Sequence, residues 1–171
     1  TLDGACPCHY GYDARMEVLC ENGVLQIGSS QQPGLSRIHR DGRVVGIFLH
    51  DNFARASKRS GAWMSSFRCQ TRNGGDVIPI IVNNNNFAKA APGQPTLLSF
   101  DDVRTLFHEF GHGLHGLLSS VGYERLSGTN VLRDFVELPS QLFEHWMREP
   151  AVLRRHARHA VTGGPIAEAM I

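Results

Sequence analysis

Strand-like apolar runs come before helix-like patterns along this chain. Residues 44–49 form an apolar run rich in β-branched side chains, and Asp41-Gly42 shortly before it is typical of a tight turn between two strands. The chain is regular from Arg37 onward, so we expect a β-hairpin around this turn.

A second strand pair is predicted over residues 67–72 and 77–82, on either side of the turn-forming segment 73–76. Pro79 lies inside the second strand. Because proline cannot donate a hydrogen bond to a β-ladder, we expect that strand at a sheet edge or with a bulge. The four asparagines at 83–86 are predicted to form the loop that leaves it.

Helical patterns dominate the second half of the chain. Ser99 and Asp102 have the spacing of a capping box, which predicts a helix from there to about Ser119. A second helix is expected over residues 133–148, beginning late or kinked at Pro139, and a third over residues 151–162.

Strands followed by helices predict an α+β fold, with a small antiparallel sheet ahead of the helices. Residues 1–36 show no lasting periodicity, and only a short strand over residues 24–27 is expected there. We therefore divide the chain into a poorly readable N-terminal segment, residues 1–36, and one folded unit, residues 37–171.

Composition excludes several classes of partner. The 171 residues are 42% hydrophobic and 19% charged, which suits a chain with a buried core. The formal net charge of +1 provides no field for nucleic acids or anionic membranes, and the short basic stretch 154–159 is expected to be a solvated helix face. No apolar run reaches the roughly 20 residues that span a bilayer. From the near-neutral charge we predict no nucleic-acid partner, and from the charge and the short apolar runs together we predict no membrane partner.

Cysteine usage bears on the cellular compartment. Cys6 and Cys8, beside His9, have the form of half a metal site, but no matching second pair follows, so we do not expect a metal there. Cys20 and Cys69 are the other two cysteines. Reduced thiols are the simpler interpretation and predict a cytoplasmic protein.

The strongest chemical signal is the sequence His-Glu-x-x-His at residues 108–112, inside the first predicted helix. Residues four apart lie one above the other on a helix, so His108 and His112 can hold one metal ion. Glu109 lies about 100° around the helix from His108, beside the ion, where a general base for a metal-bound water belongs. The pattern predicts a zinc hydrolase.

A catalytic zinc usually has three protein ligands, so a third ligand must come from elsewhere. The second predicted helix offers Asp134, Glu137 and Glu144 near one face, and spacing alone does not choose among them. His115 is a further candidate, although a supporting or solvent-facing role suits it better. Asp101, Asp102 and Asp134 are candidates for orienting the histidines, with capping and ordinary ion pairs as the alternative.

Two segments carry a family resemblance. Residues 105–118, together with the motif Gly-Thr-Asn-x-x-Arg-Asp-Phe-Val-Glu-Leu-Pro-Ser-Gln at 128–141, closely resemble the thimet oligopeptidase family of zinc peptidases. The segment Arg-Ser-Gly-Ala-Trp-Met at 59–64 and the pair His145-Trp146 resemble its peptidyl-dipeptidase (dipeptidyl carboxypeptidase) branch. The resemblance covers residues 42–164.

The resemblance implies a role for each site residue. His108, His112 and Glu137 would be the ligands of one zinc ion per chain, and Glu109 the catalytic carboxylate. Residues 77–86 look like the family's edge-strand region near the substrate cleft, where a peptide could pair through its main chain.

The resemblance also sets the expected context. The parent enzyme would be mainly helical, zincin-type and several times longer, and its substrates would be short peptides. Residues 37–171 would be a partial catalytic domain, because the family's substrate-binding tyrosine and histidine groups would follow Ile171. The oligomeric state is not indicated.

The function expected from these residues is hydrolysis of short peptides, with release of C-terminal dipeptides. A zinc-bound water would attack the peptide bond, with Glu109 as general base. Two alternatives remain at this stage. One is an inactive fragment that binds zinc or peptide, and the other is a structural zinc protein whose ion has four protein ligands.

Overall fold

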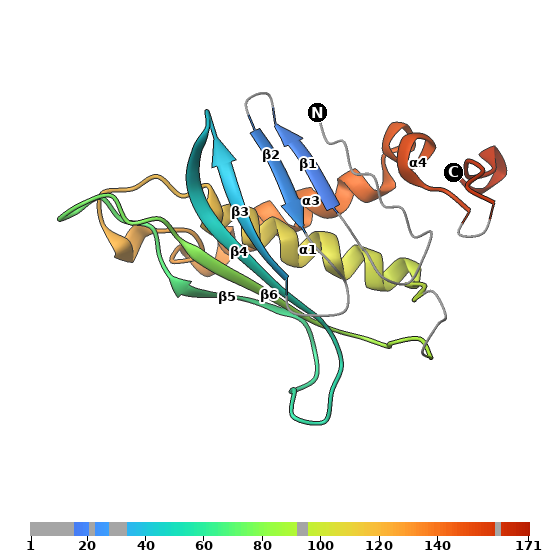
Figure 1. Ribbon diagram of the computed structural model, residues 1–171, viewed down its shortest axis with the longest axis horizontal. Coiled ribbons are helices and arrows are strands. Elements are labelled where there is room, and N and C mark those ends of the chain that lie inside the picture. Colours follow the sequence, from blue (N-terminus) through green and yellow to red (C-terminus); the bar gives the residue numbers. More distant parts are fainter. Residues whose placement is uncertain (1–15, 21–22, 28–33, 92–95, 160–161) are drawn as a thin grey trace.

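The computed structural model contains a four-stranded sheet with helices packed on one of its faces (Figure 1). This arrangement confirms the predicted α+β class. Cys6, Cys8 and His9 lie outside the part of the chain that the structure describes. That part comprises residues 16–20, 23–27, 34–91, 96–159 and 162–171.

The predicted hairpin is confirmed. Strand β3 (Gly34–Arg40) pairs antiparallel with β4 (Arg43–Phe53). Asp41 and Gly42 between them have φ angles of 51° and 75°. Two successive residues with positive φ form the turn whose twist matches that of the flanking strands, which explains why Asp-Gly is found here.

The sheet is mixed, not wholly antiparallel as expected. Its order is β3-β4-β6-β5, where β5 is Trp63–Arg68 and β6 is Ile80–Phe87. The chain leaves β4, forms β5 at the edge of the sheet, and returns as β6 into the space between them. Strand β5 runs opposite to β4, and β6 is antiparallel to β5, so β6 runs parallel to β4.

The predicted position of residues 77–86 is wrong in two respects. Strand β6 is interior, with neighbours on both sides, and residues 83–86 belong to it instead of forming a loop. Asn83 and Asn85 are 1% and 0% exposed. Burial and pairing on both edges outweigh the weak strand propensity of asparagine. Pro79 lies just before the strand, where its missing N–H costs no ladder bond.

The N-terminal part contributes a separate two-stranded sheet. Strand β1 (Met16–Cys20) pairs antiparallel with β2 (Gly23–Ile27). The short strand predicted over residues 24–27 is therefore confirmed, whereas its partner β1 was not predicted.

The helices follow the predicted order with corrected ends. The helix predicted from Ser99 is α1, and the one predicted over residues 133–148 is interrupted at Glu137, before Pro139. The third ends six residues earlier than expected. The observed elements are α1 (Phe100–Leu117), α2 (Arg133–Val136), α3 (Leu138–Arg148) and α4 (Pro150–His156), with short 3-10 turns at Glu124–Leu126 and Glu168–Met170.

Helix α1 lies between the sheet and α3 and so forms the centre of the molecule (Figure 1). The buried core on its sheet side includes Phe48 of β4, Ile81 of β6, and Phe110 and Leu117 of α1. The rings of Phe48 and Phe110 meet edge to face with centroids 5.5 Å apart. This core holds the histidine-bearing helix against the sheet.

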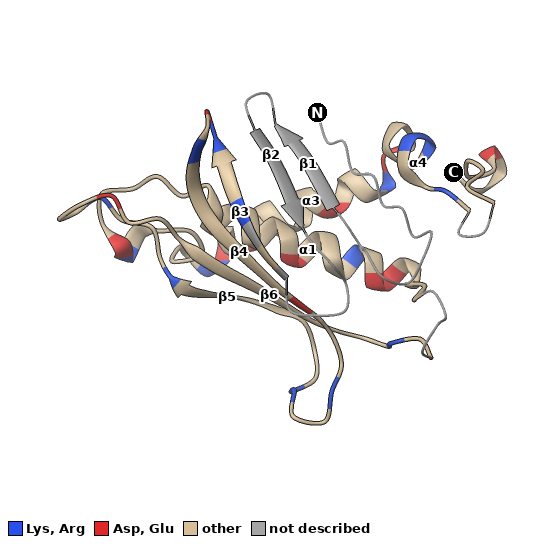
Figure 2. Cartoon of the chain, viewed as in Figure 1, with Lys and Arg blue, Asp and Glu red and all other residues tan. Residues whose placement is uncertain are grey.

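Charged residues of both signs are interspersed over the sheet and the helices, and α4 contains the arginines Arg154 and Arg155 (Figure 2). One of these, Arg154, forms an ion pair with Glu168 at 2.9 Å. Among the helices of the described ranges, none has the length and apolar character needed to cross a membrane.

Candidate metal centre

Helix α1 presents two imidazoles side by side. Ser99 caps its N-terminus: the Ser99 hydroxyl accepts from the Asp102 N–H at 3.1 Å, and the Asp102 carboxylate accepts from the Ser99 N–H at 3.1 Å. This is the capping box predicted from the sequence. One turn separates His108 from His112, and their ring centroids are 4.9 Å apart.

Glycine at position 111 lets α3 approach this helix closely. A Cβ atom on Gly111 would lie 2.6 Å from the Pro139 carbonyl oxygen and 2.6 Å from Ser140 Cα, both of which are backbone atoms. Any larger residue would push α3 away. The contact brings the residue just before α3, Glu137, to the histidine face of α1.

The Glu137 carboxylate meets both histidines. Its Oε2 lies 3.3 Å from His108 Nε2 and 3.1 Å from His112 Nε2. Within the described residues these three form the group able to hold a metal ion, with ligand atoms all within 4.8 Å of one another. Ligands about 2.0–2.2 Å from a tetrahedral zinc lie about 3.4 Å apart, so the spacing and the donor types both fit zinc.

Ser140 and the histidines hold Glu137 in its charged form. Ser140 Oγ donates to Glu137 Oε2 at 2.8 Å. Burial alone raises the pKa of Glu137, but the Ser140 hydrogen bond and the two imidazoles outweigh it and set the pKa below its ordinary value. An ionised carboxylate is the form that binds a metal.

Glu144 approaches His108 from the other side of the ring. Its Oε1 lies 2.6 Å from His108 Nδ1. A carboxylate accepts only, so Nδ1 donates to Glu144, and Nε2 faces Glu137 and His112, where its lone pair would bind a metal. Glu144 was one of three candidates for the third ligand. The structure places it behind the histidine, and Asp134 is exposed on α2, outside the group.

Glu109 points from α1 toward the sheet and is only 6% exposed. Burial raises the pKa of Glu109, while His108 and a backbone hydrogen bond from Met64 of β5 oppose that rise. A raised pKa suits a carboxylate that must take up a proton during a reaction. The sequence did not predict the hydrogen bond from the Met64 backbone to Glu109, because no local pattern places β5 beside α1.

The remaining candidates have other partners. His115 is half-buried, its ring centroid lies 6.2 Å from that of Phe135, and burial lowers its pKa. Asp101 forms an ion pair with Arg104 at 3.2 Å. Asp102 is used in the capping box, so capping and ion pairing account for both aspartates.

Most of this chain is similar to known proteins. The model of the family described as peptidase family M3 matches residues 35–171. Over 123 residues the chain is 52% identical to a dipeptidyl carboxypeptidase of Salmonella typhimurium, covering 72% of this chain and 18% of the relative. It is 50% identical over 124 residues to the dipeptidyl carboxypeptidase of Escherichia coli, with the same coverage.

Oligopeptidase A of Escherichia coli is also similar, at 40% identity over 129 residues, which cover 74% of this chain and 19% of that protein. The chain thus spans about a fifth of the length of the curated relatives that it matches.

Proposed function

Because this chain belongs to peptidase family M3, as its resemblance to the thimet oligopeptidases led us to expect, we propose that it is the metal-bearing part of a zinc metallopeptidase. The observation that carries the proposal is the meeting of His108, His112 and Glu137 within 4.8 Å. These three residues would hold one zinc ion. Residues 37–171 would be a partial catalytic domain of the larger enzyme.

Three protein ligands leave a fourth position on a tetrahedral ion open, which favours a catalytic site over a structural one. When bound, zinc would polarise the peptide carbonyl and make water acidic near neutral pH. The protein's own part is to present the two imidazoles to the ion. Burial lowers the pKa of His112, and Glu144 keeps His108 Nε2 free for binding.

Glu109 would act as the general base. It would take the proton of the attacking water and later deliver it to the departing amine, a contribution of about 10²–10⁴-fold. Its burial supports the assignment, because a raised pKa brings the carboxylate nearer to the working pH. A structural zinc site would give this buried carboxylate no role.

The peptide would bind at β5. Residues 77–86, which were predicted to form the edge of the sheet, lie mostly in its interior strand β6. The edge strand beside the site is β5, and the backbone of Met64 in β5 forms a hydrogen bond with Glu109. A short peptide could add there through main-chain pairing. The two similar dipeptidyl carboxypeptidases support release of C-terminal dipeptides as the specific reaction. Cys69, a free thiol, supports a cytoplasmic location.

The test is cleavage of a short quenched peptide by the full-length protein, with and without a chelator. We expect cleavage, loss of it on chelation, and recovery on adding one equivalent of zinc. His112→Ala should bind less than one zinc per chain by atomic spectroscopy and should not cleave. A full-length protein that holds zinc tightly but cleaves no peptide would favour the structural alternative.

A further inference from the structure

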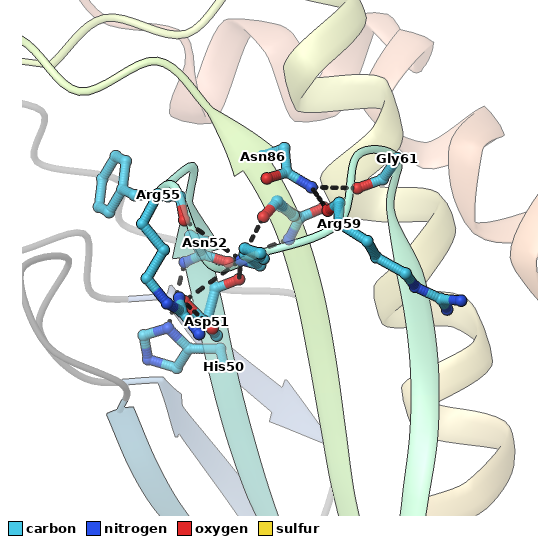
Figure 3. A network of polar contacts seen from close by, with 10 residues as sticks. His50, Asp51, Asn52, Arg55, Arg59, Gly61 and Asn86 are labelled. Atoms are coloured by element: carbon cyan, nitrogen blue, oxygen red, sulfur yellow. Dashed lines mark hydrogen bonds and ion pairs between the residues drawn. The ribbon is translucent and has the colours of Figure 1, made fainter.

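The loop over residues 54–62, which joins β4 to β5, contains a lysine whose side chain is buried against the sheet. The Lys58 side chain is 3% exposed. Its ammonium donates to the backbone carbonyls of Asp51 at 2.6 Å, of Phe53 at 3.2 Å, and of Asn85. Figure 3 shows this network at the ends of β4 and β6, with Asp51 and Asn52 near its centre.

These carbonyls converge because the ladder between β4 and β6 is broken there. Asp51 is paired with Asn84, whereas Phe53 is paired with Phe87, so the register shifts between them. A bulge of this kind leaves backbone groups without a ladder partner. The three N–H donors of the Lys58 ammonium provide hydrogen bonds to carbonyls at this break in the ladder.

The charge of the ammonium is balanced inside the same network. Asp51 Oδ1 lies 3.2 Å from Lys58 Nζ, and Asp51 Oδ2 accepts from Arg55 at 2.6 Å. Burial alone raises the pKa of Asp51, but Arg55 and Lys58 outweigh it and lower the pKa. The cation is thus paired, as a buried charge requires.

The far half of the loop is held from the neighbouring strand. The Asn86 side chain donates to the carbonyls of Arg59 at 2.8 Å and Gly61 at 2.7 Å (Figure 3). The Arg59 guanidinium lies 4.1 Å from the ring centre of Trp63, the first residue of β5. Contacts therefore run without a break from the bulge into β5.

We propose that Lys58 is a positioning residue for the sheet edge at the metal centre. Its ammonium closes the bulge, holds the loop over residues 54–62, and thereby sets where β5 enters and where Met64 meets Glu109. This inference rests on the proposed function in one respect, namely that β5 is the edge on which the peptide lies. Lys58 itself touches neither the metal ligands nor Glu109.

The chain offers a matched control, since Lys58 and Lys89 are its two lysines and Lys89 is exposed. Lys58→Met and Lys89→Met are compared in the full-length protein. In Lys58→Met, we expect backbone amides over residues 54–68 to exchange hydrogen faster, with zinc still at one per chain. We expect kcat/KM to fall by up to about 100-fold, mainly through KM, because a displacement of about 1 Å in a positioning element has that order of effect. Lys89→Met should match the wild type.

Asn86→Ala keeps the Lys58 ammonium and removes only the hydrogen bonds to the Arg59 and Gly61 carbonyls. If Lys58→Met does not fold, we expect this variant to show the faster amide exchange over residues 54–68. Unchanged exchange over residues 54–68 in the folded variants would overturn the proposal, as would a fall in kcat with KM constant. If the wild type cleaves no peptide, the proposed function fails, and the exchange rates still decide the role of Lys58.

Discussion

Glu144 Oε1 lies 2.6 Å from His108 Nδ1, on the side of the imidazole away from Glu137. This contact engages Nδ1 and leaves Nε2 facing Glu137 and His112, where a metal would bind. Partners of this kind commonly change metal affinity by about 10–100-fold when they are removed.

We therefore expect Glu144→Ala to weaken zinc binding by about 10–100-fold, because the His108 ring loses its orientation. Competition with a chelator of known affinity measures the effect. Glu124→Ala, at an exposed position, is the control and should leave the affinity unchanged. Equal zinc affinity in the two variants would show that Glu144 does not orient the ligand.

Glu109→Gln should retain zinc and lose peptide cleavage by about 10²–10⁴-fold, because the amide cannot accept the proton of water. Atomic spectroscopy and single-turnover cleavage by the full-length protein separate the two properties. Asp101→Asn makes the same chemical change at an exposed position of α1 and should retain activity. Normal turnover in Glu109→Gln contradicts its assignment as general base.

Gly111→Ala should destabilise the protein by about 1–3 kcal/mol, the usual cost of overpacking, and should weaken zinc binding as well. The added Cβ would lie 2.6 Å from backbone atoms of α3, so α3 and Glu137 must move away from the histidines. Thermal unfolding and chelator competition measure the two effects. Gly122→Ala, with nothing within 4 Å of its Cβ, is the control. A stable Gly111→Ala variant with normal zinc affinity would refute the close approach.

Asp51 should make stability depend on acid pH. Arg55 and Lys58 lower its pKa in the folded state, so its stabilisation is fully present above the unfolded value of about 3.9 and is lost as the pH falls through the folded pKa. Denaturant unfolding of zinc-free wild type and Asp51→Asn measures this. The difference in unfolding free energy should be largest at pH 5 and above and should shrink below pH 4. A difference that stays constant with pH would contradict the assigned partners.

The sequence by itself determined the elements whose causes are local. Asp41-Gly42 encodes the turn of the hairpin, and Ser99 with Asp102 encodes the start of α1. The His108–His112 pair follows from helical spacing alone. Each of these features depends on residues only a few positions apart, so the amino-acid sequence alone was enough to predict it.

The family resemblance indicated Glu137 among the acidic candidates, and only the tertiary structure explains how this residue reaches the histidines. Spacing alone did not choose among Asp134, Glu137 and Glu144, although Glu137 is the most central. The position of Glu137 beside the histidines depends on the close approach of α3 to Gly111 of α1. The same contact that brings Glu137 to the histidine face of α1 places Glu144 behind His108.

The sheet was decided in the same way. The asparagines at 83–86 look like a loop by local propensity, yet they form an interior strand, because partners on both edges and α1 above them outweigh that propensity. The carbonyls that surround Lys58 come from two strands, 34 positions apart at their extremes, Asp51 and Asn85. The sequence pattern does not predict that these carbonyls converge, because they come together only when the two strands pair.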